Sequence, residues 1–138
     1  MPIIHAFKSE YSFLAMDYPC RIDYHGDLYP TLQHAFLAAM ATNSKDKQYV
    51  RRNSSPAEAL KRSRKIERRS DWEAVESTVL YLLSKIKFAP GSKLAQRLLA
   101  TGDADLVEGK VGITEHLGTI LMRVRKELRA AQERATAA

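Results

Sequence analysis

Apolar residues at helical spacing constrain this chain more than any other feature of its sequence. After Pro30, apolar side chains fall at positions i, i+3, i+4, i+7 and i+8: Leu32, Ala35, Phe36, Ala39 and Met40. A second stripe begins at Trp72 and continues to Ile86, and Pro90-Gly91 ends it. This spacing puts side chains on one face of a helix that packs on a core. The sequence therefore predicts a domain built mainly from amphipathic helices.

Capping signals predict where further helices begin. Ser55-Pro56-Ala57-Glu58 combines a capping box with proline at the first helical position. Ser70-Asp71-Trp72-Glu73 has the same capping-box pattern, and Ser92 is suited to cap a short helix that ends at Gly102. A last helix is expected from about Thr114, because apolar residues from Leu117 to Leu128 fall on one face.

One short segment before these helices is typical of a β-hairpin. Ile22 and Tyr24 precede His25-Gly26-Asp27, and Leu28 and Tyr29 follow it. Turn-forming residues between two short apolar runs favour antiparallel strands. The predicted fold class is thus mainly α (α+β), a compact helical domain with a small β-hairpin near the N-terminus.

The length and composition indicate an ordinary globular domain. The chain has 138 residues, 45% of them hydrophobic and 28% charged, which predicts a single domain over 1–138 with a frayed tail at 130–138. Its N-terminus lacks the pattern of a signal peptide, and no apolar run approaches the length of a membrane span. With a single Cys20 and four scattered histidines, we expect a cytoplasmic protein without a metal or a cofactor.

The net charge of +6 has a local origin. The segment from Arg51 to Arg69 contains eight basic residues and two acidic ones, Glu58 and Glu67. The rest of the chain has equal numbers of basic and acidic residues. A basic region on a neutral body suits an anionic ligand or partner. The alternative is a helix face that is simply solvated, because exposed charges contribute little energy.

Several short runs, taken in order, resemble the NADAR family, whose name refers to NAD and ADP-ribose metabolism. The runs extend from about residue 10 to residue 129 and are the following: Glu10-Tyr11-Ser12-Phe13-Leu14, Tyr18-Pro19, Tyr29-Pro30-Thr31 with His34-Ala35-Phe36, Ser55-Pro56, Arg64, Asp71-Trp72-Glu73, Lys87-Phe88, Leu99-Ala100-Thr101-Gly102-Asp103, Leu106-Val107-Glu108, Leu117-Gly118-Thr119-Ile120-Leu121-Met122 and Val124-Arg125. The resemblance implies a compact helical fold and hydrolysis of an N-glycosidic bond between ribose and a base. Implied substrates are phosphoribosyl pyrimidines of the riboflavin pathway or ADP-ribose linked to guanine.

Cleavage of a ribosyl C–N bond builds positive charge on the ribose, so a nearby carboxylate stabilises the transition state or activates water. In the family resemblance, the catalytic glutamate falls on Gln33, whose neutral amide can only hydrogen-bond. The family's tryptophan is retained as Trp72 and an arginine as Arg64. Of the polar loop expected after Leu106-Val107-Glu108, only residues 109–116 remain.

Other family positions also differ, since Ala15 replaces an asparagine, Met40 a lysine and Ser63 a glycine. These losses concentrate at the implied pocket. Glu108 and Glu115 flank the shortened loop and are possible substitutes for the missing carboxylate. They are also explained as a surface charge and an acid in the first turn of a helix.

The predicted ligand-binding residues are His34, Arg64, Trp72, Lys61 and Tyr29. For several of these residues the sequence pattern also offers a purely structural explanation. Trp72 lies on an apolar stripe and is suited to the core, and His34 is suited to a buried structural role. Arg64 belongs to a row with Lys61, Lys65 and Arg68 at i, i+3, i+4 and i+7, which a solvated helix face would also show.

The sequence leaves three functions open. The first is binding of a ribose-phosphate or ADP-ribose-type nucleotide in a NADAR-like pocket, with N-glycosidic hydrolysis weakened or lost, for sequestration or sensing. The second is an active N-glycosidase with a relocated carboxylate. The third is a nucleic-acid or protein-binding module that uses the basic segment, although few aromatic residues there could stack on bases. A small-molecule nucleotide is the favoured partner, no membrane is expected, and whether the chain is an enzyme stays open.

Overall fold

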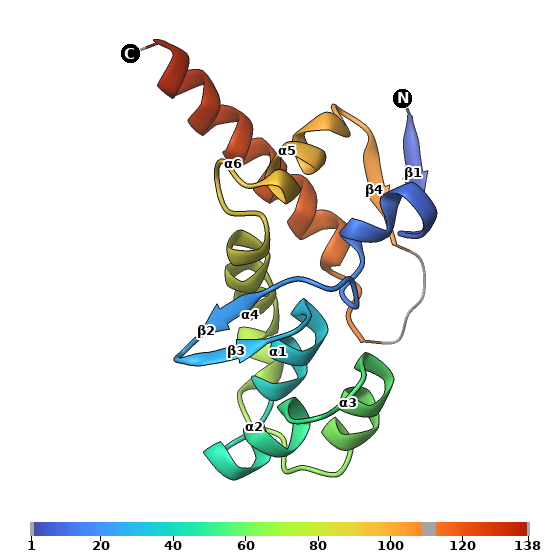
Figure 1. Cartoon of the computed structure of the whole chain (residues 1–138), viewed down its shortest axis with the longest axis vertical. Helices are drawn as coiled ribbons and strands as arrows, with labels where there is room; N and C mark the ends of the chain where they lie inside the picture. Colours follow the sequence, from blue (N-terminus) through green and yellow to red (C-terminus); the bar gives the residue numbers. More distant parts are fainter. Residues whose placement is uncertain (1, 109–112, 138) are drawn as a thin grey trace. The chain divides into compact units, whose positions relative to one another are not determined.

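The computed structural model describes residues 2–108 and 113–137 (Figure 1). The chain divides into two compact units, Met1–Ala15 with Ser84–Ala138, and Met16–Leu83. The boundary at Leu83 falls within helix α4 (Trp72–Lys87). The expectation of a single domain stays a prediction, and each unit is described by itself.

The unit Met16–Leu83 begins with the predicted hairpin. Strands β2 (Ile22–Tyr24) and β3 (Asp27–Tyr29) pair antiparallel, with Ile22 opposite Tyr29. The two turn residues both have positive φ, 52° at His25 and 86° at Gly26. That geometry matches the twist of the paired strands, which is why two-residue hairpins favour it. The prediction of a small hairpin is confirmed.

Helix α1 (Leu32–Ala38) is the centre of this unit, because all seven of its residues are buried. The side chain of Thr31 caps it by accepting a hydrogen bond from the backbone N–H of His34. Helix α3 (Pro56–Ser63) has the predicted capping box between Ser55 and Glu58. Both caps satisfy N–H groups that lack a partner within the helix.

Helix α2 (Ser44–Arg51) was not predicted from the sequence. It buries only Val50, so it has no apolar stripe to reveal it. The signal that does exist is its cap, since the Asn43 side chain accepts a hydrogen bond from the Asp46 backbone N–H across 2.8 Å.

Helix α4 begins at Trp72, as the stripe predicts, and Trp72, Leu80 and Leu83 are buried. The Trp72 ring contacts Phe36 of α1 edge-on, with ring centroids 5.1 Å apart and planes inclined by 61°. This arrangement is favourable for aromatic pairs and joins α1 to α4 in the core of the unit.

The unit Met1–Ala15 with Ser84–Ala138 contains a parallel strand pair that the sequence did not predict. Strands β1 (Ile3–His5) and β4 (Asp105–Val107) pair with Ile4 opposite Leu106. The other elements are the 3-10 helix η1 (Ser9–Leu14), α5 (Lys93–Ala100) and α6 (Leu117–Ala137). The cap of α5 by Ser92 is confirmed, since its side chain accepts from the Ala95 N–H.

Helix α6 packs against β4, and Gly118 permits the close approach. A Cβ atom at Gly118 would collide with the backbone carbonyl oxygen of Leu106. The helix begins at Leu117 rather than near Thr114 and continues to Ala137. The segment predicted as a tail is part of α6 up to residue 137, and its fraying stays a prediction.

The predicted fold class is confirmed: the chain is mainly α, with a small hairpin and one further strand pair in the described ranges. No helix in the described part of the chain is both long enough and apolar enough to cross a membrane.

Candidate functional site

Gln33 lies in the first turn of α1 and is 7% exposed. Its backbone N–H donates to the Met16 carbonyl oxygen across 2.9 Å. Its side-chain Nε2 donates to the Pro56 carbonyl oxygen across 2.8 Å. A carbonyl oxygen only accepts hydrogen bonds, so this contact requires a donor at that position, which the amide nitrogen supplies and an ionised carboxylate does not. The side chain thereby connects the first turn of α1 to the first residue of α3.

His34 is 1% exposed, and both of its ring nitrogens have partners. Nε2 lies 2.7 Å from the Ser54 carbonyl oxygen, and Nδ1 lies 2.7 Å from Thr31 Oγ1. Since the carbonyl oxygen can only accept, Nε2 carries a proton, and in the tautomer with Nδ1 unprotonated this atom accepts from the Thr31 hydroxyl. This arrangement supports the structural alternative for His34, because a buried ring with two partners is not available to take a proton from water.

Ser54 extends this network towards α2. Its hydroxyl donates to the Val50 carbonyl oxygen across 2.8 Å, while its own carbonyl holds His34. The segment between α2 and α3 is thus fixed to α1 by two side chains in succession, His34 and Gln33. The first turn of α1, where the resemblance implies a catalytic glutamate, serves here as a structural junction.

Trp72 is 1% exposed and contacts Phe36. Its location supports the core alternative, since a ring packed among helices offers no free face on which a base could stack. Ligand binding by Trp72 stays a prediction.

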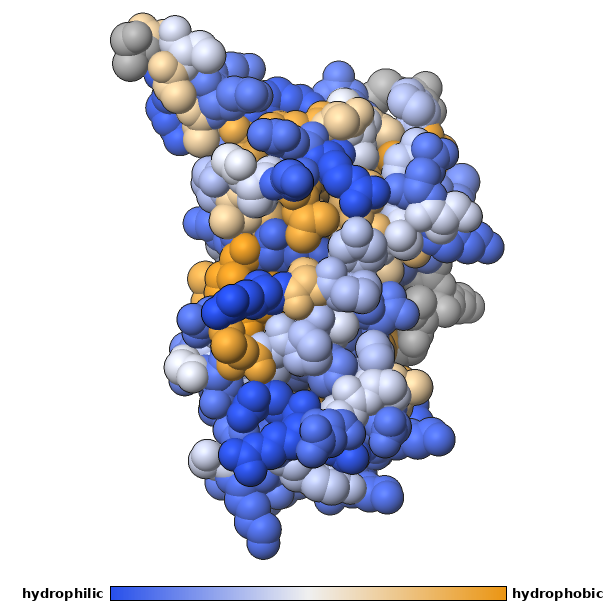
Figure 2. All heavy atoms as spheres, in the orientation of Figure 1, coloured by the Kyte–Doolittle hydropathy of each residue, from blue (hydrophilic) through white to orange (hydrophobic). Residues whose placement is uncertain are grey.

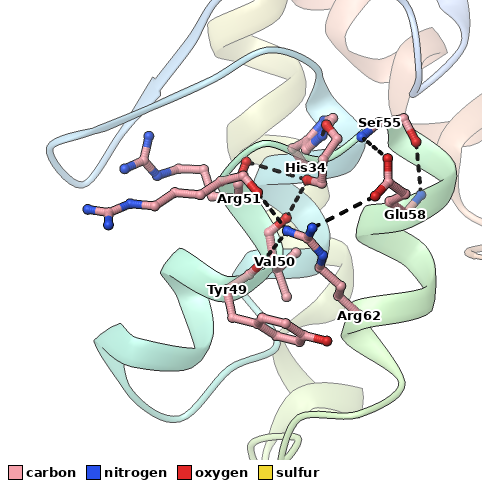
Figure 3. A network of polar contacts seen from close by, with 9 residues as sticks. His34, Tyr49, Val50, Arg51, Ser55, Glu58 and Arg62 are labelled. Carbon is pink, nitrogen blue, oxygen red and sulfur yellow. Dashed lines mark hydrogen bonds and ion pairs between the residues drawn. The ribbon is translucent and has the colours of Figure 1, made fainter.

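Three basic residues of the Arg51–Arg69 segment are held by partners within the chain. Arg51 donates to Gln48 Oε1 through both Nε and Nη2. Arg62 donates to the backbone carbonyl oxygens of Tyr49 and Arg52 (Figure 3). Arg69 forms a bidentate ion pair with Asp71. Part of the local positive charge therefore serves local structure.

The other basic residues of the segment are exposed: Arg52, Lys61, Arg64, Lys65 and Arg68. On the face shown in Figure 2, hydrophilic side chains predominate over α2 and α3. The predicted helical row from Lys61 to Arg68 is wrong, because α3 ends at Ser63 and Arg64 is its C-cap. The charged segment between α3 and α4, residues 64–71, contains no helix. Lys61 and Arg64 remain accessible to an anion in solution.

Tyr29 is 4% exposed and lines a cavity of about 330 Å³. Burial raises the pKa of its hydroxyl above the ordinary value, and the nearby Asp27 carboxylate raises it further, while Arg51 acts in the opposite direction. Sequence reasoning identified Tyr29 but missed Lys47 and Arg69, which line the same cavity. No spacing in the sequence connects these residues.

The two acidic candidates lie in the other unit. Glu108 follows β4 and is partly buried, with its Oε1 atom withdrawn from solvent. Glu115 is exposed and precedes α6. The shortened loop that separates them includes residues 109–112, which lie outside the described residues. Within the described ranges, no group of three or more His, Cys, Asp or Glu side chains is arranged to hold a metal ion.

The sequence model of the NADAR domain matches residues 4–111. The chain therefore belongs to the NADAR domain family, which confirms the resemblance drawn from its motifs. It is 32% identical over 124 residues to the N-glycosidase YbiA of Escherichia coli K12, a match that covers 80% of this chain and 76% of YbiA. The NMR structure of E. coli YbiA superposes with a TM-score of 0.81 and 28% identity, covering 95% of this chain and 87% of that chain.

A riboflavin biosynthesis protein of Vibrio vulnificus is also similar, with 33% identity over 131 residues. The match covers 86% of this chain but only 36% of the Vibrio protein. The chain thus spans about a third of the length of this relative.

Proposed function

We propose that this chain binds a ribose-phosphate or ADP-ribose-type nucleotide in a NADAR-like pocket and that its N-glycosidic hydrolysis is weakened or lost. Membership of the family and similarity to the N-glycosidase YbiA support the ligand class. The observation that carries the loss of hydrolysis is the contact between Gln33 and Pro56.

Hydrolysis of a ribosyl–base bond requires a group that stabilises positive charge or takes a proton from water. The neutral Gln33 amide can neither balance a positive charge nor take a proton from water, and its nitrogen already donates to the Pro56 carbonyl oxygen. The neighbouring His34 has both ring nitrogens engaged as well. Neither residue in the first turn of α1 is therefore suited to acid–base chemistry.

Binding makes different demands from hydrolysis. A phosphate needs accessible cations, and Lys61 and Arg64 at the end of α3 are exposed. Loss of a carboxylate also removes a repulsive charge from the neighbourhood of an anionic ligand. A family member that loses catalysis in this way can retain, or improve, affinity for the nucleotide.

Calorimetry with ADP-ribose tests this proposal, because an intact ligand should bind and be recovered unchanged by chromatography. Arg64→Ala and Lys61→Ala should each weaken binding, since each removes an accessible cation. Lys126→Ala is a matched control, because Lys126 is exposed on α6, outside the basic segment. No binding of ADP-ribose or ribose 5-phosphate, or an equal effect of all three variants, would contradict the proposal.

One observation favours the hydrolytic alternative. The Glu108 carboxylate has an oxygen withdrawn from solvent, and a carboxyl group is one of the side chains that can serve as a general acid or base in glycosidic hydrolysis. If Glu108 replaces the family's glutamate, cleavage of a ribosyl–base bond by the wild-type protein should disappear in Glu108→Gln.

A further inference from the structure

The unit Met16–Leu83 contains a cavity of about 330 Å³ that is separate from the first turn of α1. It is lined by the tip of the β2–β3 hairpin, by the start of α2, and by Arg69. The described residues Gln33, His34 and Trp72 do not line it. Its volume is at the lower end of the range for ligand pockets, roughly 300–1,000 Å³, and so suits a small ligand.

One wall of the cavity is aromatic. The rings of Tyr24 and His25 stack with centroids 4.0 Å apart and planes inclined by 16°, and both residues line the cavity. His25 adopts a φ of 52°, a conformation that glycine or asparagine adopts at lower energetic cost. The two-residue turn of the hairpin accounts for this conformation. Here it places a second flat ring beside Tyr24.

The cavity also has two cationic side chains. Lys47 lies on α2, and Arg69 lies just before α4. The carboxylate of Asp71 fixes the Arg69 guanidinium through Nε at 2.6 Å and Nη2 at 2.9 Å. These contacts do not use Nη1, so an oriented N–H group remains for another acceptor.

Asp27 is the one carboxylate among the described lining residues, and it already has partners. Gln48 Nε2 donates to Asp27 Oδ2 across 3.0 Å, and Arg51 Nη2 lies 3.9 Å from Asp27 Oδ1. Its negative charge is therefore partly compensated on the α2 side. The balance of charge in the cavity favours an anion.

We propose that this cavity binds a nucleoside monophosphate. The base stacks against the Tyr24–His25 pair, and the phosphate interacts with Lys47 and Arg69. Stacking does not select among the bases, because every base has a flat π-face. The two cations select ligands that carry a phosphate group. The site goes beyond the proposed function, since it uses residues other than Gln33, Lys61 and Arg64 and accommodates a mononucleotide.

Calorimetric titration with AMP tests this site, with adenosine and ribose 5-phosphate as partial ligands. His25→Gly removes one ring while glycine still adopts the positive φ, so the hairpin should fold normally. We expect His25→Gly and Lys47→Ala each to weaken AMP binding about tenfold. Adenosine and ribose 5-phosphate should each bind more weakly than AMP, because each lacks one of the two contacts. Lys126→Ala should have no effect.

Unchanged AMP affinity in both His25→Gly and Lys47→Ala would overturn the cavity site, as would the absence of AMP binding. The proposed function fails differently, through ADP-ribose binding that is insensitive to Arg64→Ala. A loss of AMP affinity in Arg64→Ala but not in His25→Gly would place the nucleotide at the end of α3 and exclude the cavity.

Discussion

The side-chain amide of Gln33 donates a hydrogen bond to the carbonyl oxygen of Pro56 across 2.8 Å. This contact joins the buried Gln33 side chain in the first turn of α1 to the half-buried first residue of α3. It assigns a structural task to the position where the family resemblance implies a catalytic carboxylate. If the family carries a glutamate here, as the resemblance implies, that carboxylate could not donate this hydrogen bond in its ionised form.

Replacing Gln33 by glutamate should make the stability depend on pH. The introduced carboxyl would be buried and would face a carbonyl oxygen, so its pKa should lie above the ordinary value of about 4.3. When protonated it can donate the lost hydrogen bond. A raised pKa in the folded state means that stability is retained below the unfolded pKa and is lost as the pH rises through the folded pKa.

Thermal melts of Gln33→Glu and wild type at several pH values measure this effect. We expect similar stability near pH 4 and a deficit of about 1–3 kcal/mol for the variant at pH 7, the cost of an unsatisfied buried group. A constant difference between the two proteins from pH 4 to pH 8 would contradict this assignment.

Removal of the Thr31 hydroxyl should destabilise the protein through two contacts. Thr31 Oγ1 accepts from the His34 backbone N–H and donates to His34 Nδ1. Thr31→Val keeps the shape but removes both contacts, and we expect a cost of about 1–3 kcal/mol in the free energy of unfolding. Urea denaturation measures it, with Thr136→Val on the exposed end of α6 as the control. Equal stability of Thr31→Val and wild type would show that the network is not significant.

Trp72 should stabilise the folded protein through packing rather than contact the ligand. Its ring is buried against Phe36, so Trp72→Ala should lower the free energy of unfolding by about 3–5 kcal/mol. Trp72→Phe retains most of the packing, and we expect it to bind ADP-ribose with the wild-type affinity. A selective loss of affinity in a stable Trp72→Phe protein would instead support a direct contact with the ligand.

Tyr29 should titrate later than an exposed tyrosine. Burial and the Asp27 carboxylate raise the pKa of its hydroxyl above the ordinary value of 10.0. The neutral form is therefore favoured in the folded state, so stability from this group is present below pH 10 and is lost as the pH rises through the raised pKa. Spectrophotometric titration should show one tyrosine that ionises at higher pH than the others, and this step should be absent in Tyr29→Phe. The Tyr29→Phe variant should also resist alkaline unfolding better than wild type. A Tyr29→Phe titration curve that retains the late tyrosine would contradict this.

The sequence predicts those parts of the fold that depend on local signals. The stripe after Pro30, the capping box at Ser55 and the turn at His25-Gly26 each correspond to the element they predict. Helix α2 was missed because it buries only Val50, and the β1–β4 pair was missed because three-residue strands show no clear alternation. Pairing of strands about one hundred residues apart depends on tertiary contacts that short patterns do not contain.

The candidate site was less predictable than the fold. The role of His34 depends on the carbonyl oxygen of Ser54, and that of Gln33 depends on the carbonyl of Pro56. Backbone atoms carry no signature of residue type, so no motif could identify these partners. The cavity is likewise formed by residues from separate segments, of which the sequence singled out only Tyr29 as a ligand-binding residue.

The most direct test of the central claim is a chromatographic assay for base release from ADP-ribosyl guanine and from a phosphoribosyl pyrimidine. Wild type should bind the nucleotide and release no base. Gln33→Glu should gain activity or stay inactive, since positioning by the shortened loop is not restored by one side chain. Glu108→Gln and Glu115→Gln should behave as wild type. Robust base release by the wild-type protein that disappears in Glu108→Gln or Glu115→Gln would contradict the account and establish this chain as an N-glycosidase with a relocated carboxylate.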